Sequence, residues 1–443
     1  MPALHDHPTV RRHASAPHRE RPSQLSSVRL RELALACGAD DCGFVEVERP
    51  SIAADRADIE RALPGAKSLI AFARRMNRED VRTPARSVAN LEFHHTTDEV
   101  NDIARRIVAA LEQDGVRALN PASGFPMETD RWGGRMWIVS HKLVAEAAGL
   151  GRRGIHRNVI HPRFGNFILL GTVIIDAAID AYSQPIDYNP CLECKLCVAA
   201  CPTGAIGADG AFNVSACYTH NYREFMGGFI DWVANVAGSS SAAEYRKRVS
   251  DTETVSMWQS LAFGPSYKAA YCMSVCPAGE DVIGPFLADR SQFLETVVRP
   301  LQEKQETIFV LPDSDAETYV ARRFPFKTTK RVSNGNRAVS AAAFIRALPL
   351  GFQREHAGAL DATYHFTFTG DETFSATVTS REKKIRVMPG CVGNADLEIT
   401  ADTATWLRFV RKESSLLWPL LRRKIRLEGP PRLLAAFGKC FAS

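Results

Sequence analysis

Seven of the eleven cysteines lie between residues 191 and 276, and their spacing constrains the chain more than any other feature. The stretch CLECKLCVAACP follows the pattern C-x2-C-x2-C-x3-C-P, with Cys191, Cys194, Cys197 and Cys201. This spacing lets a tight loop wrap three thiolates around one iron–sulfur cluster while the fourth reaches a neighbouring cluster. Zinc sites usually use two separated C-x2-C pairs. The pattern therefore predicts a 4Fe–4S cluster.

A second stretch, YKAAYCMSVCP at 267–277, would complete a C-x2-C-x3-C-P pattern if Ala269 were cysteine. In a two-cluster arrangement the last cysteine of the second motif returns to the first cluster. We therefore expect the first cluster to be held by Cys191, Cys194, Cys197 and Cys276. The remaining thiols, expected at a second cluster, are Cys201, Cys217 and Cys272.

Three interpretations remain open for the second site, which has three thiolates and an empty Ala269 position. It could hold a 3Fe–4S cluster, which needs only three thiolates. It could hold a 4Fe–4S cluster with a non-cysteine ligand or an open iron, and His220 is the nearest candidate in the sequence. It could also be lost, leaving structural cysteines. We favour a cluster, and we favour a surface or hydrogen-bonded role for His220.

The hydrophobic pattern indicates an α+β multidomain chain. Residues 1–27, rich in Arg, His and Pro, are expected to be a disordered basic tail. An α/β cofactor domain is expected over 28–183 and a ferredoxin-like domain over 184–300. A polar linker is expected at 301–339 and a small α+β domain at 340–443.

Particular elements support this division. A strand is expected at 68–73, and a helix is expected to start at Thr96 with a capping box and to end at Gly115. A second helix is expected before the glycines at 149 and 151, and a buried strand at 166–176. In the last domain, alternating aromatic residues around Gly370 predict a β-hairpin.

Composition indicates a soluble protein, with 45% hydrophobic and 24% charged residues and a net charge of +5. No apolar run reaches the roughly 18 residues that a membrane helix needs. Arg11 and Arg12 are not followed by the apolar segment of an export signal. We expect a cytoplasmic location. The basic tail would suffice only for non-specific contact with nucleic acid, so a nucleic-acid partner is not expected.

The helix before Gly149, the segment GLGRRGIHRNVIHPRFG and the cysteine block that follows resemble the cobalamin-dependent epoxyqueuosine reductase and reductive dehalogenase superfamily. The resemblance covers residues 28 to 300. It implies a nitroreductase-like first domain that holds a corrinoid and two clusters that supply it with electrons. The cofactor-binding residues implied are Gly149, Gly151, Gly154, His161, Phe164 and Gly165. For the glycines, the alternative is a helix C-cap and tight turns.

The chain also departs from this family. Epoxyqueuosine reductases carry an acidic proton donor in a D-x-x-P-hydrophobic-x-E pattern, but the corresponding stretch here is GGRMWIVSHK. Queuosine chemistry is therefore doubtful. The polar residues that remain as candidates for a proton donor or anion clamp are Ser140, His141, Lys142, Arg152, Arg153 and His156, among which His141, Lys142 and Arg152 are the predicted catalytic residues.

Residues 340–443 resemble the sterol carrier protein type two fold, which implies a lipid-sized tunnel between helices and a twisted sheet. The alternative is that its apolar faces close on themselves. We expect an iron–sulfur reductase that takes electrons from a ferredoxin, flavodoxin or reductase and cleaves a carbon–heteroatom bond in a small, possibly lipid-like molecule. The rival hypothesis is a non-enzymatic redox or lipid carrier.

Overall fold

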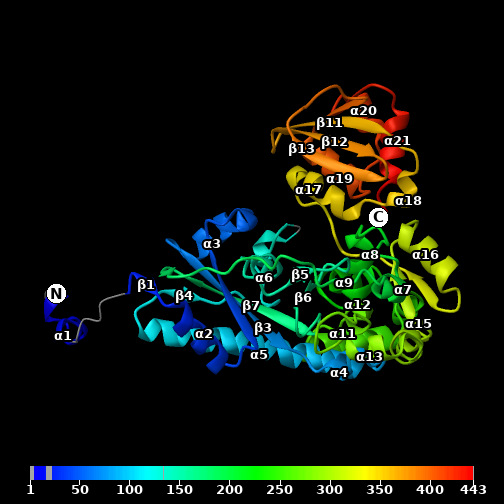
Figure 1. The fold of residues 1–443 in the computed structure, drawn as a ribbon. Helices are drawn as coiled ribbons and strands as arrows, with labels where there is room; N and C mark the ends of the chain where they lie inside the picture. Colours follow the sequence, from blue (N-terminus) through cyan, green and yellow to red (C-terminus); the bar gives the residue numbers. More distant parts are fainter. Residues whose placement is uncertain (1–3, 16–21, 133, 443) are drawn as a thin grey trace.

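The computed structural model describes residues 4–15, 22–132 and 134–442 (Figure 1). A helix, α1 (Pro8–Ser15), forms within the segment expected to be disordered, and an ion pair between Arg11 and Asp6 lies beside it. None of its residues is buried. Figure 1 shows it standing away from the rest of the chain. The expectation of disorder is therefore wrong for this helix. Residues 1–3 and 16–21, for which disorder was also expected, lie outside the described residues.

The first domain is built on a four-stranded antiparallel sheet with the order β2-β3-β7-β4. The strands are β2 (Asp41–Glu46), β3 (Ser68–Arg75), β7 (Ile168–Ile175) and β4 (Ala118–Leu119). The central strands β3 and β7 have continuous apolar stretches because helices cover both faces of the sheet.

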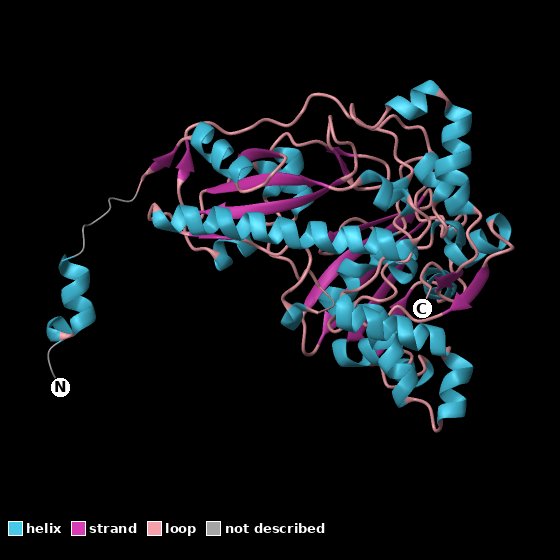
Figure 2. Cartoon of the chain, turned by 90° about the horizontal axis from the view of Figure 1, so that it is seen from below, coloured by secondary structure: helices cyan, strands magenta, loops and turns pink. Residues whose placement is uncertain are grey.

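The helix on one face is α5 (Arg86–Gln113), whose buried side chains pack with those of β2, β3 and β7. It begins ten residues before the start predicted at Thr96, which lies buried within it. On the other face α6 (His141–Ala147) packs its Val144 against the same sheet. The long α5 runs along the molecule in Figure 2. Other helices of this domain are α2 (Ser27–Ala36), α3 (Arg56–Ala62) and α4 (Arg78–Arg82).

The cysteine-rich domain consists mainly of short helices around one apolar core. The two cysteine motifs lead into α7 (Leu196–Ala200) and α12 (Tyr271–Ser274), which contact each other. Between them lie α8 (Val214–Asn221), α9 (Met226–Ala237), α10 (Ala242–Arg248) and α11 (Asp251–Phe263), and after them come α13 (Gly284–Ala288), α14 (Arg290–Phe293) and α15 (Arg299–Gln302).

Residues 301–339 were expected to be a linker, but most of them are folded. The parallel strands β9 (Thr307–Val310) and β10 (Thr328–Arg331) are joined by α16 (Asp315–Arg323). Ile308 and Val320 are fully buried in the core that also contains Cys197 and Cys201. This mostly polar segment forms a short βαβ unit. Four of its apolar residues pack in that core: Ile308, Val310, Ala316 and Val320.

The C-terminal domain is a five-stranded sheet with the order β13-β12-β11-β14-β15. The predicted hairpin is confirmed by β11 (Ala362–Thr369) and β12 (Phe374–Arg381), and the other strands are β13 (Lys384–Pro389), β14 (Leu397–Asp402) and β15 (Ile425–Glu428). The helices are α17 (Ala341–Gly351), α18 (Arg354–Ala357), α19 (Thr403–Val410), α20 (Leu417–Leu421) and α21 (Arg432–Lys439).

Aromatic rings fill the space between this sheet and its helices. Phe366 and Trp406, both almost fully buried, lie with ring centroids 5.6 Å apart. Phe366 also contacts the rings of Phe344 and Phe437. These rings occupy the position where the sterol-carrier resemblance implied a tunnel, so the apolar faces close on themselves. No described helix is long and apolar enough to cross a membrane.

Candidate metal centre

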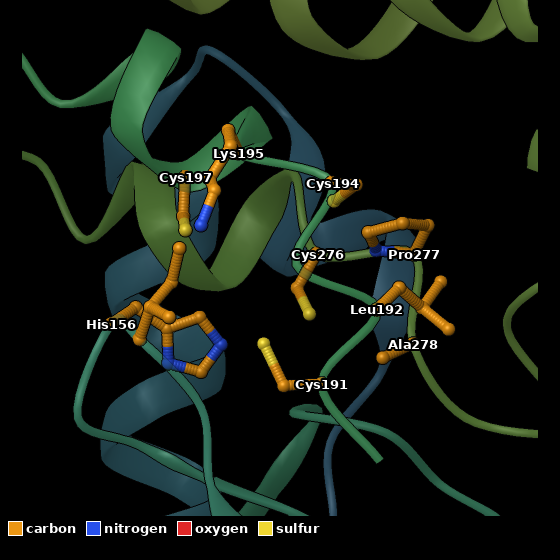
Figure 3. Close-up of a pocket in the computed structure, with 10 residues that line it drawn as sticks. His156, Cys191, Leu192, Cys194, Lys195, Cys197, Cys276, Pro277 and Ala278 are labelled. Atoms are coloured by element: carbon orange, nitrogen blue, oxygen red, sulfur yellow. The ribbon is translucent and has the colours of Figure 1, made fainter. Parts of the chain in front are cut away.

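Four cysteines from two distant segments line one pocket. Cys191, Cys194 and Cys197 come from the first motif and Cys276 from the second, and they line a pocket that is partly open to solvent. Figure 3 shows sulfurs of these residues directed toward a shared centre. The cysteines predicted to hold the first cluster are thus brought together.

The arrangement suits a cluster better than a single ion. Within the described part of the chain no cysteines are paired in disulfides, and no three His, Cys, Asp or Glu side chains are close enough to share one metal ion. In a cubane each thiolate ligates a different iron, so four sulfurs surround a wide space without meeting at one point. A zinc ion would draw its four sulfurs to about 2.3 Å from one atom.

The two motifs have the same local backbone. Lys195, just after Cys194, has φ +63° and precedes α7, while Ala270, just after Ala269, has φ +54° and precedes α12. Positive φ is uncommon for such residues, so its repetition indicates two copies of one loop. Ala269 therefore occupies the position that corresponds to Cys194. Its backbone N–H donates to Asn221 Oδ1 at 3.0 Å.

The three remaining thiols form a second group. Burial, followed by the nearby Cys272 and Cys201, raises the pKa of Cys217. Burial also raises the pKa of Cys272 to about 12, with Cys201 adding to the effect and Lys142 opposing it. Buried thiols with raised pKa values become thiolates when a metal displaces the proton, so metal binding here releases protons. The three thiols predicted to hold the second cluster therefore lie close together.

Three cations lie near the thiols: Arg82 is buried, Arg86 is half-buried and Lys142 is exposed. Lys142 lies near Cys272 and Cys217, Arg82 near Cys276 and Arg86 near Cys272. Burial lowers the pKa of each of these cations. Two guanidinium nitrogens of each arginine are buried without a hydrogen-bond partner in the described structure. Arg82 Nη1 pairs with Glu79 Oε1 at 3.3 Å. A thiolate-ligated cluster would supply a further anion close to the two guanidinium groups.

Sequence reasoning identified Lys142 but missed both arginines. Arg82 and Arg86 lie in α4 and α5, more than 100 residues before the first cysteine of the block. The signal that could have found them is weak. Each is an arginine inside an otherwise apolar helix face, beside Val81 and Ala89.

His220 is hydrogen-bonded through one ring nitrogen, and its Nε2 is buried without a hydrogen-bond partner in the described structure. Its Nδ1 accepts a hydrogen bond from the N–H of Phe309 at 3.3 Å, which ties α8 to β9. Burial, followed by Lys268, Lys327 and Lys304, lowers its pKa to about 3. None of the three thiols contributes to this shift. The hydrogen-bonded role favoured from sequence agrees with this geometry.

The predicted catalytic residues have different surroundings. His141 is bonded through both ring nitrogens, Nδ1 to the hydroxyl of Thr172 at 2.9 Å and Nε2 to the carbonyl of Ala122 at 3.0 Å. Neither nitrogen is free to transfer a proton. Arg152 is half-buried in β5 (Arg152–Arg153), with no side-chain partner in the described structure. Only Lys142 lies beside a thiol group.

The residues predicted to hold a corrinoid are occupied by internal contacts. A Cβ on Gly149 or Gly151 would lie within 2.4 Å of the carbonyl oxygens of Gln184 and Ile160 respectively, and one on Gly154 would meet the side chain of Ile160 at 2.7 Å. These glycines allow close backbone packing, which was the alternative considered for them. They do not form an open cradle for a large cofactor.

His161, Phe164 and Gly165 also have structural roles. His161 Nε2 lies 3.1 Å from Asp41 Oδ2, and its ring stacks on Phe164 with centroids 4.6 Å apart. Gly165 has φ +65°, and a Cβ there would lie 2.0 Å from the carbonyl oxygen of Ala278. Gly165 therefore lets the first domain contact the loop that carries Cys276.

Comparison with known proteins identifies the two smaller domains. Residues 185–207 match the 4Fe-4S binding domain, which contains the first cysteine motif. Residues 350–442 match the SCP-2 sterol transfer family. The chain is thus an α+β multidomain protein with an iron–sulfur binding domain and a sterol-carrier-like domain.

Part of the chain is similar to epoxyqueuosine reductases. The enzyme of that name from Synechococcus sp. is 30% identical over 200 residues, which cover 44% of this chain and 55% of the relative. The chain spans about a quarter to a half of the length of the first curated relatives it matches.

Two solved structures were also matched. One is an epoxyqueuosine reductase with an epoxyqueuosine-modified tRNA-Tyr stem loop, at 21% identity, a TM-score of 0.33, and coverage of 43% of this chain and 56% of the other. The second is a catabolic reductive dehalogenase in complex with 3-bromo-4-hydroxybenzoic acid, at 17% identity, a TM-score of 0.33, and coverage of 40% and 25%.

Proposed function

We propose that this chain is an iron–sulfur oxidoreductase that takes electrons from an external donor and reduces a small organic molecule. The observation that carries the proposal is the position of Cys276, which belongs to the second motif but lines the pocket of the first. Crossed ligation of this kind places two clusters side by side. Neighbouring clusters serve to move electrons, whereas a single structural metal needs no partner.

In this proposal electrons enter at the first cluster, whose loop carries the exposed Leu192, and continue to the second. The second thiol group lies against the first domain through Lys142 and Asn158. The final acceptor is therefore placed between the second cluster and that domain. The nearby cations Lys142, Arg82 and Arg86 would balance the negative charge that builds up on reduction.

The corrinoid implied by the family resemblance is not part of this route. Gly149, Gly151 and Gly165 pack against protein backbone and Gly154 packs against the side chain of Ile160. His161 stacks on Phe164, so the residues expected to hold the corrinoid are already in internal contacts. We also propose that the substrate is not an epoxyqueuosine-containing tRNA, because the acidic proton donor of that family has no counterpart in GGRMWIVSHK. Reductive cleavage of a carbon–heteroatom bond is the reaction class proposed.

The rival hypothesis of a lipid carrier has less support. A carrier of this kind needs an internal tunnel, and aromatic rings fill the interior of the C-terminal domain. We propose that this domain closes over or stabilises the iron–sulfur domain.

The proposal is tested by anaerobic reconstitution of the full chain and of two matched variants. Cys194→Ser removes one predicted ligand, whereas Cys391→Ser removes an exposed cysteine outside the block. We expect Cys194→Ser to lose the visible absorbance of the first cluster and the dithionite-driven reduction of artificial acceptors, while Cys391→Ser keeps both. Bound zinc in place of iron, or full electron transfer in Cys194→Ser, would refute the proposal. Stoichiometric cobalt in the purified protein would restore the corrinoid route.

A further inference from the structure

His156 is a buried histidine that lines the same pocket as the four cysteines. Its side chain is almost fully buried, with 3% of the residue exposed. In Figure 3 one nitrogen of its ring points toward the sulfur of Cys191, across the space where the four sulfurs converge. The ring is thus part of the wall around the first cluster, although it belongs to the first domain.

The hydrogen bonds of the ring determine where its proton lies. Nδ1 is 3.1 Å from the backbone nitrogen of Asn158, whose N–H donates to it. A ring nitrogen that accepts a hydrogen bond carries no proton, so the neutral ring is protonated on Nε2.

The Nε2–H group has no partner among the described residues. Buried polar groups are normally hydrogen-bonded, and each exception needs an explanation. The ring cannot easily turn away, because its loop is closed by two backbone hydrogen bonds, Gly154 N–H to Asn158 O at 3.0 Å and Arg157 N–H to Gly154 O at 2.9 Å. A Cβ on Gly154 would lie 3.2 Å from the ring. The donor is therefore held in place beside the pocket.

We propose that His156 donates an N–H···S hydrogen bond to the first cluster, at the sulfur of Cys191 or the inorganic sulfide next to it, and thereby raises the reduction potential of that cluster. This inference rests on the proposed function, since it needs a cluster in the four-cysteine pocket. Hydrogen bonds to the sulfurs are one of the factors that set cluster potentials. The hydrogen bond stabilises the reduced cluster more than the oxidised cluster, because the reduced cluster carries more negative charge.

The test compares two substitutions in the reconstituted full chain. His156→Gln retains an N–H donor on a side chain of similar reach, whereas His156→Leu fills the space without a donor. Iron content and thermal unfolding first establish that both variants fold and carry the cluster. A redox titration followed by electron paramagnetic resonance then gives the potential. We expect His156→Leu to shift the reduction equilibrium about tenfold toward the oxidised cluster, about 59 mV for one electron, and His156→Gln to stay near the wild type.

A second measurement needs no substitution. In the wild-type protein, electron–nuclear double resonance of the reduced first cluster is expected to show an exchangeable proton that disappears in D₂O and a nitrogen coupling that changes with ¹⁵N-histidine. A fully loaded His156→Leu with the wild-type potential would overturn the inference, as would a wild-type cluster with no exchangeable proton nearby. If the wild type forms no cluster at all, the proposed function fails instead.

Discussion

The side-chain nitrogen of Asn158 lies 3.9 Å from the sulfur of Cys272, a predicted ligand of the second cluster. The amide oxygen of the same side chain accepts a hydrogen bond from Lys142 Nζ at 2.9 Å. Its backbone N–H donates to His156 at the first cluster. Asn158 therefore connects the two thiol groups. It contacts Cys272 and the positively charged Lys142 at the second group, and His156 at the first.

Replacing Lys142 with Met is expected to make the second cluster harder to reduce. The ammonium group lies near Cys272 and Cys217, so its loss removes a positive charge that favours the reduced state. We expect the reduction equilibrium to move by several-fold, as measured by redox titration. Lys142→Arg keeps the charge and is the control. Equal potentials in Lys142→Met and the wild type would show that the ammonium does not act on the cluster.

Replacing Ala269 with Cys is expected to supply the missing fourth thiolate. Ala269 is buried at the position equivalent to Cys194, so a sulfur there would face the second thiol group. We expect a higher iron content per chain and a changed electron paramagnetic resonance spectrum. Ala269→Ser introduces a similar volume without a thiolate and is expected to match the wild type. Identical iron and spectra in Ala269→Cys would mean that this loop does not face a cluster.

Replacing Gly165 with Ala is expected to disturb the first cluster through the backbone. The new methyl group would lie 2.0 Å from the carbonyl oxygen of Ala278, two residues after Cys276. The matched control is Gly115→Ala, which has a similar positive φ of +78° but open space around it. The control is expected to cost about 1 kcal/mol of unfolding free energy. Gly165→Ala is expected to cost more and to lower the iron content, and a normal iron content would contradict this.

Acidification is expected to weaken the cap of α19. The hydroxyl of Thr405 donates to Asp402 and holds the pKa of that carboxyl below its usual value. Because the folded-state pKa is lowered, the stabilisation is complete above about pH 4 and is lost as the pH falls through the folded-state pKa.

Asp402→Ala is therefore expected to cost about 1 kcal/mol at neutral pH, the usual value of an N-cap. The difference from the wild type should shrink below about pH 4. Thermal unfolding between pH 3 and 7 measures this stability difference. The control is Asp371→Ala, at an exposed turn residue. A difference that stayed constant across this range would argue against a charged cap.

Replacing Phe366 with Ala is expected to destabilise the C-terminal domain by about 3–5 kcal/mol. The fully buried ring contacts Phe344, Trp406 and Phe437, so its removal leaves a cavity. Phe366→Leu should cost less. Urea unfolding gives the values, and titration with a fluorescent fatty acid tests the filled core directly. Stoichiometric binding of that probe by the wild type would show that the rings move aside for a lipid.

The short-range patterns were the most predictive part of the sequence. The cysteine spacing predicted which sulfurs line the first pocket, because ligand spacing within a loop is a local property. Arg82 and Arg86 were missed because they reach the cluster by tertiary packing of α4 and α5. The segment 301–339 was misjudged because its polar residues outnumber the few apolar ones that decide its burial. The glycines at 149 and 151 were assigned to a cofactor, although backbone packing accounts for them.

The βαβ unit at 307–331 also connects the two halves of the chain. Asp315, in α16, accepts hydrogen bonds from the backbone nitrogens of Glu355 and His356 at the start of the C-terminal domain. Ala316 and Val320 of the same helix pack in the core that holds α7. Displacing the C-terminal domain would therefore pull on the core behind Cys197 through α16, alongside the contact of α17 with α8 and the ion pair of Arg354 with Asp209.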